Sequence, residues 1–450
     1  MAEQLPDIAA ALAQLRARIT DYQLYHDYAA GRHRLAFATE KYRNAFGALF
    51  RAFADNLCSG VVDAVADRLV VTGFSVEQGP ESAANDAWAI WIVNRMDQRA
   101  GEVHNEALTS GDAFVIVWPD GDNNPTIYPQ DAANVTVRYD PETPGRLLWA
   151  AKVWLADDKR YRLNLYYSDR IEKYVTQAKA EAGLPESGSG FVPFEAPGEA
   201  WPLVNPYGQV PVFHFANNAR VGRFGRSELA DVVPLQDALN KSIADMLVAM
   251  EFVALPQRWA TGLEVEIDEV TGKPKAPFVP GVDRIWSVAS EDTRFGQFDP
   301  ADLGQFLEVQ EKFRKEIATV SRTPLHFIIP PAGQWPSGEA LRSAESAFLK
   351  KIRDRQVAFG NIWEDVMRFA LRVAGKPDAM LSCQWEDPTP RVALEMAQVA
   401  LIKQQLGVSQ QRILSELGYS PQEIEQIQAE AEENADVAAS TAARAYNRGA

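Results

Sequence analysis

The sequence predicts an α+β fold that is mainly helical, and three observations support this prediction. Apolar residues recur every three or four positions through several long segments, which is typical of amphipathic helices. Short β-like runs, each bounded by Asp, Asn, Gly or Pro, are concentrated between about residues 110 and 215. Two further helical segments bracket an insert at 255–298, which predicts a helical hairpin carrying a small domain.

The first 225 residues are expected to combine helices with an antiparallel meander. Helical spacing covers about 6–69 and 84–109, and a loop rich in Gly, Pro and Ser occupies 183–201. The strand-like runs lie at 114–119, 126–128, 134–139, 147–154, 160–167, 170–175 and 210–215.

The predicted hairpin consists of one helix at 226–254 and a second at 299–322, each with a continuous apolar stripe. Weak strand signals around Val265, Phe278 and 285–288 fill the insert between them. A segment with four prolines follows at 323–338 and is expected to form no regular element. A loop of this length between long helices is a functional candidate, although an ordinary helix connector remains the alternative.

The C-terminal part is expected to be helical. One long helix is predicted over 339–374, with Ser337 as its N-cap and Gly375 as its stop signal. Two or three shorter helices follow between 391 and 434, and the last fifteen or so residues are expected to fray.

Composition excludes several classes of protein. The chain has 450 residues, of which 46% are hydrophobic and 24% charged, as expected for a globular protein of two or three domains. No apolar run approaches the roughly 20 residues that cross a bilayer, and no signal peptide is evident, so we expect no membrane partner and a reducing cytoplasm. A formal net charge of −16 argues against tight wrapping of nucleic acid, but an acidic wall would let a DNA strand slide past.

Motifs for catalysis are missing from the sequence. There is no phosphate-binding glycine loop, the five histidines are scattered, and no pair of carboxylates has a diagnostic spacing. His214 is expected to be a partly buried, hydrogen-bonded strand residue, and Cys58 and Cys383 to be buried apolar fillers. We therefore predict no enzymatic activity, no cofactor and no metal site.

Two basic clusters leave alternatives open. Lys350, Lys351, Arg353 and Arg355 lie within the long helix and either contact phosphates or form a solvated face with ion pairs to Asp354 or to neighbouring subunits. Three arginines interleaved with glycines either hold a subunit contact or form a solvated turn: Arg220, Arg223 and Arg226.

Three segments, in their order along the chain, resemble the portal proteins of tailed bacteriophages, in particular the group similar to the portal of Bacillus phage SPP1. They are GRSELADVVPLQDALNKSIADMLVAMEFVALPQRWATG (225–262), the stretch from Ser321 to Leu371, and YHDYAAGRHRL (25–35). The resemblance runs over most of residues 20–400 and contains no catalytic signature.

The resemblance implies a portal fold with a wing, a two-helix stem, a small α/β clip, a tunnel loop and a helical crown. It assigns them as follows: wing 1–225 and 339–375, stem 226–254 and 299–322, clip 255–298, tunnel loop 323–338, crown 376–435 and flexible tail 436–450.

It also implies a homo-oligomeric ring, typically of twelve subunits, at one capsid vertex of the virion, assembled in the host cytoplasm. Double-stranded DNA would pass through it, and its partners would be the terminase large subunit, the head–tail adaptor, and the major capsid and scaffold proteins. The tunnel-loop residues would be His326, Phe327, Ile328, Ile329, Gln334 and Trp335. Asp231, Asp237, Asp245, Glu308 and Glu311 are candidates for the channel lining, and Arg322, Lys350, Lys351, Arg353 and Arg355 for DNA-proximal cations.

Two alternatives remain at this point. Another head or neck connector component would usually be shorter and would lack the helix–insert–helix–proline-loop order. A cytoplasmic nuclease or hydrolase would need a cluster of carboxylates or histidines that the sequence does not display.

Overall fold

The structure, a computed structural model, describes residues 5–34, 55–143, 145–180, 183–195, 198–221, 223–254, 258–262, 267, 292–297, 302–330, 337–389, 393–417 and single positions between 419 and 429. Its contacts define two compact units. Unit 1 comprises residues 1–23, 63–227 and 338–450, and unit 2 comprises 24–62 and 228–337. Helices α1 (Leu5–Ala29) and α3 (Leu57–Ala66) each contribute residues to both units.

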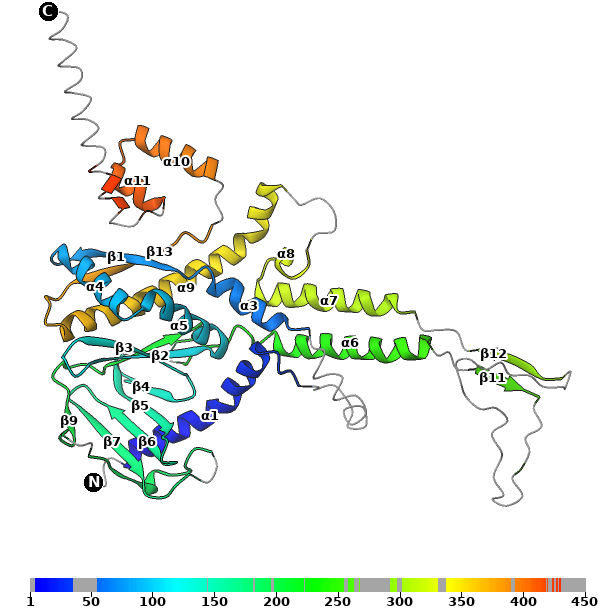
Figure 1. Ribbon diagram of the computed structural model, residues 1–450, viewed down its shortest axis with the longest axis horizontal. Coiled ribbons are helices and arrows are strands. Elements are labelled where there is room, and N and C mark those ends of the chain that lie inside the picture. The colour runs from blue at the N-terminus through cyan, green and yellow to red at the C-terminus, as the bar shows by residue number, and fades with distance from the viewer. Residues whose placement is uncertain are drawn as a thin grey trace, which may run out of the picture. The chain divides into compact units, whose positions relative to one another are not determined.

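Unit 1 has the mixed composition that the sequence predicts (Figure 1). Its other helices are α4 (Ser82–Val93), α5 (Met96–Ser110), α9 (Gly338–Val373), α10 (Ala393–Gln405) and α11 (Gln410–Glu416), with a short 3-10 helix, η1 (Gly188–Gly190). Its strands are β1 (Val71–Gln78), β2 (Asp112–Pro119), β3 (Pro125–Gln130), β4 (Val135–Tyr139), β5 (Leu147–Leu155), β6 (Tyr161–Tyr166), β7 (Arg170–Thr176), β8 (Phe191–Pro193), β9 (Leu203–Val204), β10 (Val212–Ala216) and β13 (Met380–Trp385).

The predicted antiparallel meander is confirmed for the strands between 134 and 175, whereas the strands predicted at 114–119 and 126–128 belong to a separate sheet. Strands pair in the order β4-β5-β6-β7-β8, with β9 also on β7, and every pairing is antiparallel. One face of this sheet packs against α1, whose Ile8, Leu12 and Leu15 lie in one cluster with Trp149 and Leu163. A second, three-stranded sheet has the order β10-β2-β3.

A third sheet of two strands corrects the predicted boundary of the C-terminal part. β13 pairs with β1 in an antiparallel register that sets Phe74 opposite Cys383. Residues 380–385 therefore belong to a sheet with residues 71–78, although the family resemblance implied a separate helical crown over 376–435. A pairing across about three hundred residues leaves no local signal.

The helix predicted over 84–109 is two helices, because the chain turns at Asn94 and Arg95. Arg95 adopts a left-handed conformation with φ 56°. The Asn94 amide donates to Ile90 O at 2.9 Å and to Pro125 O at 3.0 Å, and its Oδ1 accepts from Ile127 N at 2.9 Å. Asn94 thus ends α4. It also hydrogen-bonds backbone groups of the edge strand β3, and without Asn94 these groups would be free to pair with another strand.

Helix α9 has nearly the predicted bounds and carries the aromatic core of unit 1. Trp363 packs edge-on against Trp91, with ring centroids 4.9 Å apart, and its indole N–H donates to His104 Nε2 at 2.8 Å. The helix ends where Gly375 turns left-handed at φ 66°, which confirms the predicted stop.

Unit 2 contains α6 (Val233–Ala254), α7 (Gly304–Ser321), the single-turn helix α8 (Leu325–Ile328) and a pair of antiparallel strands, β11 (Arg258–Thr261) and β12 (Arg294–Gln297). The apolar stripe predicted that this helix begins at 226, but α6 begins at Val233. Pro234 explains the difference, because proline fits the first turn of a helix but cannot donate to a preceding one.

The prediction that 323–338 forms no regular element is wrong at α8. Pro324 precedes the helix as its N-cap residue, where its missing N–H costs nothing. Phe327 N donates to Pro324 O at 3.0 Å and Ile329 N to Leu325 O at 2.8 Å, so four residues form one turn.

Candidate functional site

The most distinctive element of unit 2 is the hairpin of α6 and α7. The two helices lie side by side, and β11 and β12 continue from their far ends (Figure 1). Gln310 and Ile317 are buried on α7, and the Gln310 amide contacts Met246 Sδ of α6 at 3.5 Å. The Arg314 guanidinium also forms an ion pair with Asp55 at 2.8 Å, which fixes α7 to the segment before α3.

The hairpin leaves apolar side chains exposed. Leu307 on α7 is 59% exposed, and Val309, Val320 and Met250 are each more than two-fifths exposed. Single exposed apolar side chains are ordinary on a monomer, whereas a contiguous patch of them marks an interaction surface. The exposed side chains of the hairpin are available for packing against another chain.

The predicted channel acids have different surroundings. Asp231, Glu308 and Glu311 are exposed. Glu311 pairs with Lys315 at 2.6 Å, and the hydrogen bond and charge of this lysine lower the pKa of the carboxyl. Asp245 is half-buried and pairs with Lys241 one turn earlier. The exposed face of α7 therefore carries both signs of charge and is not purely acidic.

Asp237 does not fit the predicted channel-lining role, because its side chain is buried within its own chain. It is 7% exposed and accepts a 2.5 Å hydrogen bond from the Tyr28 hydroxyl. Burial raises the pKa of this carboxyl, although the Tyr28 hydrogen bond acts in the opposite direction. The helical periodicity of α6 could not distinguish this acid from an exposed one.

Asp237 belongs to a polar cluster that sequence reasoning missed, which we call the clasp: Tyr28, His33, Asp237 and Asn240. The His33 ring stacks on Tyr28 with centroids 4.9 Å apart, and its Nδ1 lies 2.8 Å from the Asn240 amide nitrogen. Burial lowers the pKa of His33. The clasp fixes the end of α1 to the first turns of α6, and its signal was the unexplained YHDYAAGRHRL motif.

The described part of the predicted tunnel loop is amphipathic. Phe327 is 42% exposed, and His326, Ile328 and Ile329 are half-buried. The rings of His326 and Phe327 meet edge to face with centroids 4.7 Å apart. Gln334 and Trp335 lie outside the described residues. Arg322 is exposed just before this loop and ends α7 in a left-handed conformation with φ 55°.

Two strands frame the predicted clip. β11 pairs with β12 in a register that sets Trp259 opposite Gly296. The Trp259 indole lies so close to Gly296 that a Cβ added there would be only 2.3 Å from the ring. The predicted strands at Val265, Phe278 and 285–288 lie outside the described residues.

The basic cluster of α9 does not form one surface. Lys350 and Arg353 are exposed, Arg355 is half-buried and Lys351 is buried. Lys350 pairs with Asp354 at 2.6 Å and Arg353 donates to Thr389 at 3.3 Å. Because successive helix positions turn by about 100°, the four cations diverge. The structure supports an ion pair with Asp354 for Lys350. Lys351 is buried within its own chain and therefore cannot contribute to a DNA-contacting surface of this chain.

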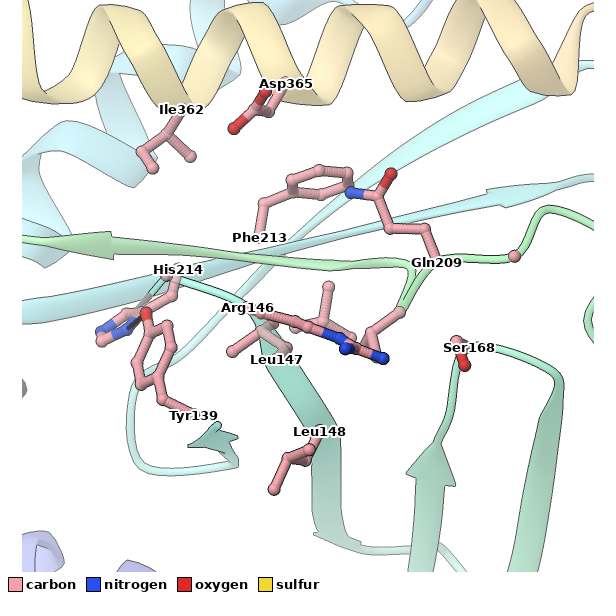
Figure 2. A pocket seen from close by; sticks show the side chains of 14 residues that line it. Tyr139, Arg146, Leu147, Leu148, Ser168, Gln209, Phe213, His214, Ile362 and Asp365 are labelled. Carbon is pink, nitrogen blue, oxygen red and sulfur yellow. Dashed lines mark hydrogen bonds between the residues drawn. The ribbon is translucent and has the colours of Figure 1, made fainter. Parts of the chain in front are cut away.

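A cavity of about 360 Å³ opens in unit 1 between α9 and the sheets (Figure 2). Ile362 and Asp365 of α9 face Phe213 and Gln209, and Arg146, Leu147 and Leu148 lie on the opposite side. At one end the Tyr139 hydroxyl lies 2.8 Å from His214 Nδ1, and His214 Nε2 lies 2.7 Å from Asp112. His214 is thus a buried, hydrogen-bonded strand residue, as predicted.

The described residues offer neither a metal-binding cluster nor a membrane-spanning helix. Among them, no three His, Cys, Asp or Glu side chains gather closely enough to hold a metal ion. No helix in the same part of the chain is both long and apolar enough to span a bilayer.

The family model described as "Phage portal protein, SPP1 Gp6-like" matches residues 14–437. The chain belongs to this family of portal proteins. The family resemblance noted in the sequence is thereby confirmed, and portal proteins of this family are structural components of the phage.

Two portal proteins of mycobacteriophages are relatives of this chain. The portal protein of Mycobacterium phage L5 is 26% identical over 405 residues, which cover 83% of this chain and 78% of the relative. That of Mycobacterium phage D29 is 28% identical over 400 residues, with the same coverage.

Chains of two solved structures are also similar to this portal protein, each at 13% identity. One is from the virion of a native gene transfer agent particle, with a TM-score of 0.48 over 79% of this chain and 86% of that chain. The other is from the neck of an empty gene transfer agent particle computed with C6 symmetry, with a TM-score of 0.48 over 79% and 87%.

Proposed function

We propose that this portal protein forms a closed ring of twelve subunits at one vertex of the capsid. Double-stranded DNA enters and leaves through the centre of this ring. The observation that carries the proposal is the α6–α7 hairpin of a portal-family chain, with exposed apolar residues along it and an insert at its end. Neighbouring copies would cover these apolar side chains, because rings bring the same pair of surfaces together at every subunit.

In this ring α6 and α7 act as the stem, 255–298 as the clip, 323–338 as the tunnel loop, and unit 1 as the wing with a C-terminal crown. Glu308, Glu311 and Asp231 are the exposed acids that could face DNA, while Asp237 is not available. Carboxylates in the lumen would repel phosphate and keep the passing duplex from binding tightly. A ring structure with every one of these acids turned outward would rule out this role.

The clip would dock the terminase large subunit during packaging and the head–tail adaptor afterwards, and the wing would contact the major capsid and scaffold proteins. The ring would assemble in the host cytoplasm and persist in the virion. These partners follow from the family and from the insert at the end of the hairpin.

The tunnel loop would act as a steric diaphragm around DNA. It offers the exposed apolar ring of Phe327 and no cluster of cations, so it would contact the duplex by shape and not by binding phosphates. Negative-stain imaging of the purified chain should show rings with a central hole, whereas compact monomers would refute the proposal. Deleting residues 326–334 should leave the rings intact and reduce DNA packaging or retention. Collapse of the rings would make the loop structural instead.

A further inference from the structure

We propose that residues 218–221 and 223–226, which we call the arginine loop, form a contact with a fixed base, and that the exposed Arg220 and Arg223 bind carboxylates on a second copy of this chain. The inference rests on the proposed ring, since it names residues that would join neighbouring copies. The loop lies in unit 1, directly after β10.

The base of the arginine loop is closed by its own backbone. Arg226 N donates to Asn217 O at 2.7 Å, and the Asn217 side-chain amide donates to Arg226 O at 2.8 Å. Asn217 N also donates to Gly111 O at 2.8 Å, which ties the base to the start of β2. Loops with ends held together in this way are compact and are often functional.

Two glycines let the base pack closely. A Cβ on Gly225 would lie 1.8 Å from Gly111 O, and a Cβ on Gly111 would lie 2.8 Å from Ser227 N. Gly111 also has φ 96°, which disfavours any other residue. The backbones of the two segments are therefore in direct contact, and the loop cannot shift without separating them.

A buried carboxylate anchors the same base. Asp112 accepts hydrogen bonds from Gly225 N, from the Tyr22 hydroxyl and from His214 Nε2, each at 2.7 Å. Burial alone would raise the pKa of Asp112, but these donors outweigh it and the pKa is lowered, so the group is ionised at neutral pH. Hydrogen bonds to an ionised acceptor are stronger than neutral ones.

Aromatic contacts hold the loop from its other side. The Phe224 ring lies 5.1 Å from the His214 ring, and the Arg18 guanidinium lies 3.1 Å above the centre of Phe224. Phe224 is thus fixed between an element of the sheet and α1. Every anchored residue of the loop lies at or near its base.

The tip is exposed and its charges are not used within the described chain. Val221 is 98% exposed, and Arg220 and Arg223 beside it are also exposed. Among the described residues neither guanidinium has an ion-pair partner. A base that is already fixed lowers the entropy cost of binding at the tip, because the anchored residues are not ordered anew when the partner binds.

A second copy of the chain is the partner that fits this tip. The chain has 61 acidic and 45 basic residues, so another copy offers an excess of carboxylates. Guanidinium groups bind carboxylates through two parallel hydrogen bonds. A fully exposed valine between them suits a protein interface with an apolar centre and a charged rim. Binding to DNA phosphates would gain from more cations and would gain nothing from the valine.

The test compares Arg220→Glu/Arg223→Glu with Arg138→Glu/Arg160→Glu, which changes the net charge equally. The control residues are exposed arginines of unit 1, Arg138 on β4 and Arg160 in the turn before β6. Subunit association is measured by sedimentation and native mass spectrometry over a range of salt concentrations. Reversing both charges should weaken association on the order of 100-fold at low salt, with unchanged thermal unfolding of the subunit. Arg220→Lys/Arg223→Lys should lose less, because it keeps the charge but not the bidentate geometry.

The outcomes separate this inference from the proposed ring. If the wild-type chain forms no ring, the proposed function fails first. If rings form and Arg220→Glu/Arg223→Glu assembles as well as the control pair, the inference is overturned. Rings that assemble normally but bind duplex DNA more weakly than the control rings would also overturn it, and would assign the loop to phosphates.

Discussion

Removing the Tyr28 hydroxyl should loosen α6, because that hydroxyl is the hydrogen-bond donor to the buried Asp237 carboxylate. The bond is 2.5 Å long and has an ionisable acceptor. Hydrogen bonds to charged groups contribute about 1.5–3 kcal/mol, and an unpaired buried carboxylate costs at least as much. We therefore expect Tyr28→Phe to reduce the opening free energy of α6 by about 2 kcal/mol at pH 7.

The pH dependence has a definite sign. Burial raises the pKa of Asp237 above its unfolded value, so the folded state prefers the protonated carboxyl. Stability from this group is complete below about pH 3.8 and is lost as pH rises through the folded pKa. Tyr28→Phe removes a hydrogen bond that lowers the pKa of Asp237, so the pH-dependent loss of stability should continue to higher pH. Asp237→Asn removes the titrating carboxyl and should abolish this pH dependence.

Native-state hydrogen exchange is the suitable assay, because a chain with two units need not unfold in one step. Protection of α6 peptides would be followed from pH 5 to 8 for the two single variants and for the double variant. Tyr167→Phe is the matched control, because Tyr167 donates to Asp7 at 2.8 Å within unit 1. Unchanged α6 protection in Tyr28→Phe, or a coupling energy below about 0.5 kcal/mol between the two sites, would refute the reasoning.

Three further predictions concern unit 1. Gly225→Ala should cost more than about 3 kcal/mol in thermal or urea unfolding, since its Cβ would lie 1.8 Å from a carbonyl oxygen, whereas Gly101→Ala on open helix surface should be neutral or stabilising. Asn94→Ala removes three hydrogen bonds and should lose about 1–3 kcal/mol, with faster exchange in β3 as the readout; equal exchange would argue against the edge-capping role. Burial lowers the pKa of His104 to about 3, so the wild-type chain should lose stability as pH falls from about 6.5 toward 3. His104→Phe removes the titrating ring and should make stability depend less on pH in this range. At pH 7 the same variant should lose about 1–3 kcal/mol, because Trp363 N–H loses its acceptor.

Local signals predicted the parts of the fold that depend on neighbouring residues. The meander from β4 to β7 follows from alternation and turn residues, and α9 ends at a glycine that the sequence displays. The pairing of β1 with β13 and the break at Asn94 were not predicted, because both depend on partners far along the chain. The start of α6 was misplaced for a local reason, since the apolar stripe extends beyond the proline that limits the helix.

The candidate site was predicted less well, because a list of acids does not say which of them the fold buries. Glu308 and Asp237 look alike in the sequence, each on an amphipathic helix of the hairpin. Tyr28 separates them, since its hydroxyl reaches Asp237 from the end of α1, about two hundred residues earlier. The motif around Tyr28 was recognised only as part of a family resemblance, with no role for its residues.

The clasp also gives a physical reason why that motif contains both a tyrosine and a histidine. Tyr28 supplies the donor for Asp237, and the His33 ring covers Tyr28 while contacting Asn240 one turn further along α6. Asp237 and Asn240 are three residues apart, so they lie on the same face of α6 and can meet both aromatic side chains together. The buried carboxylate of Asp237 therefore serves to fix α6 to α1. Acids that instead face DNA in the proposed ring should be exposed ones, such as Asp231 before α6 and Glu308 and Glu311 on α7.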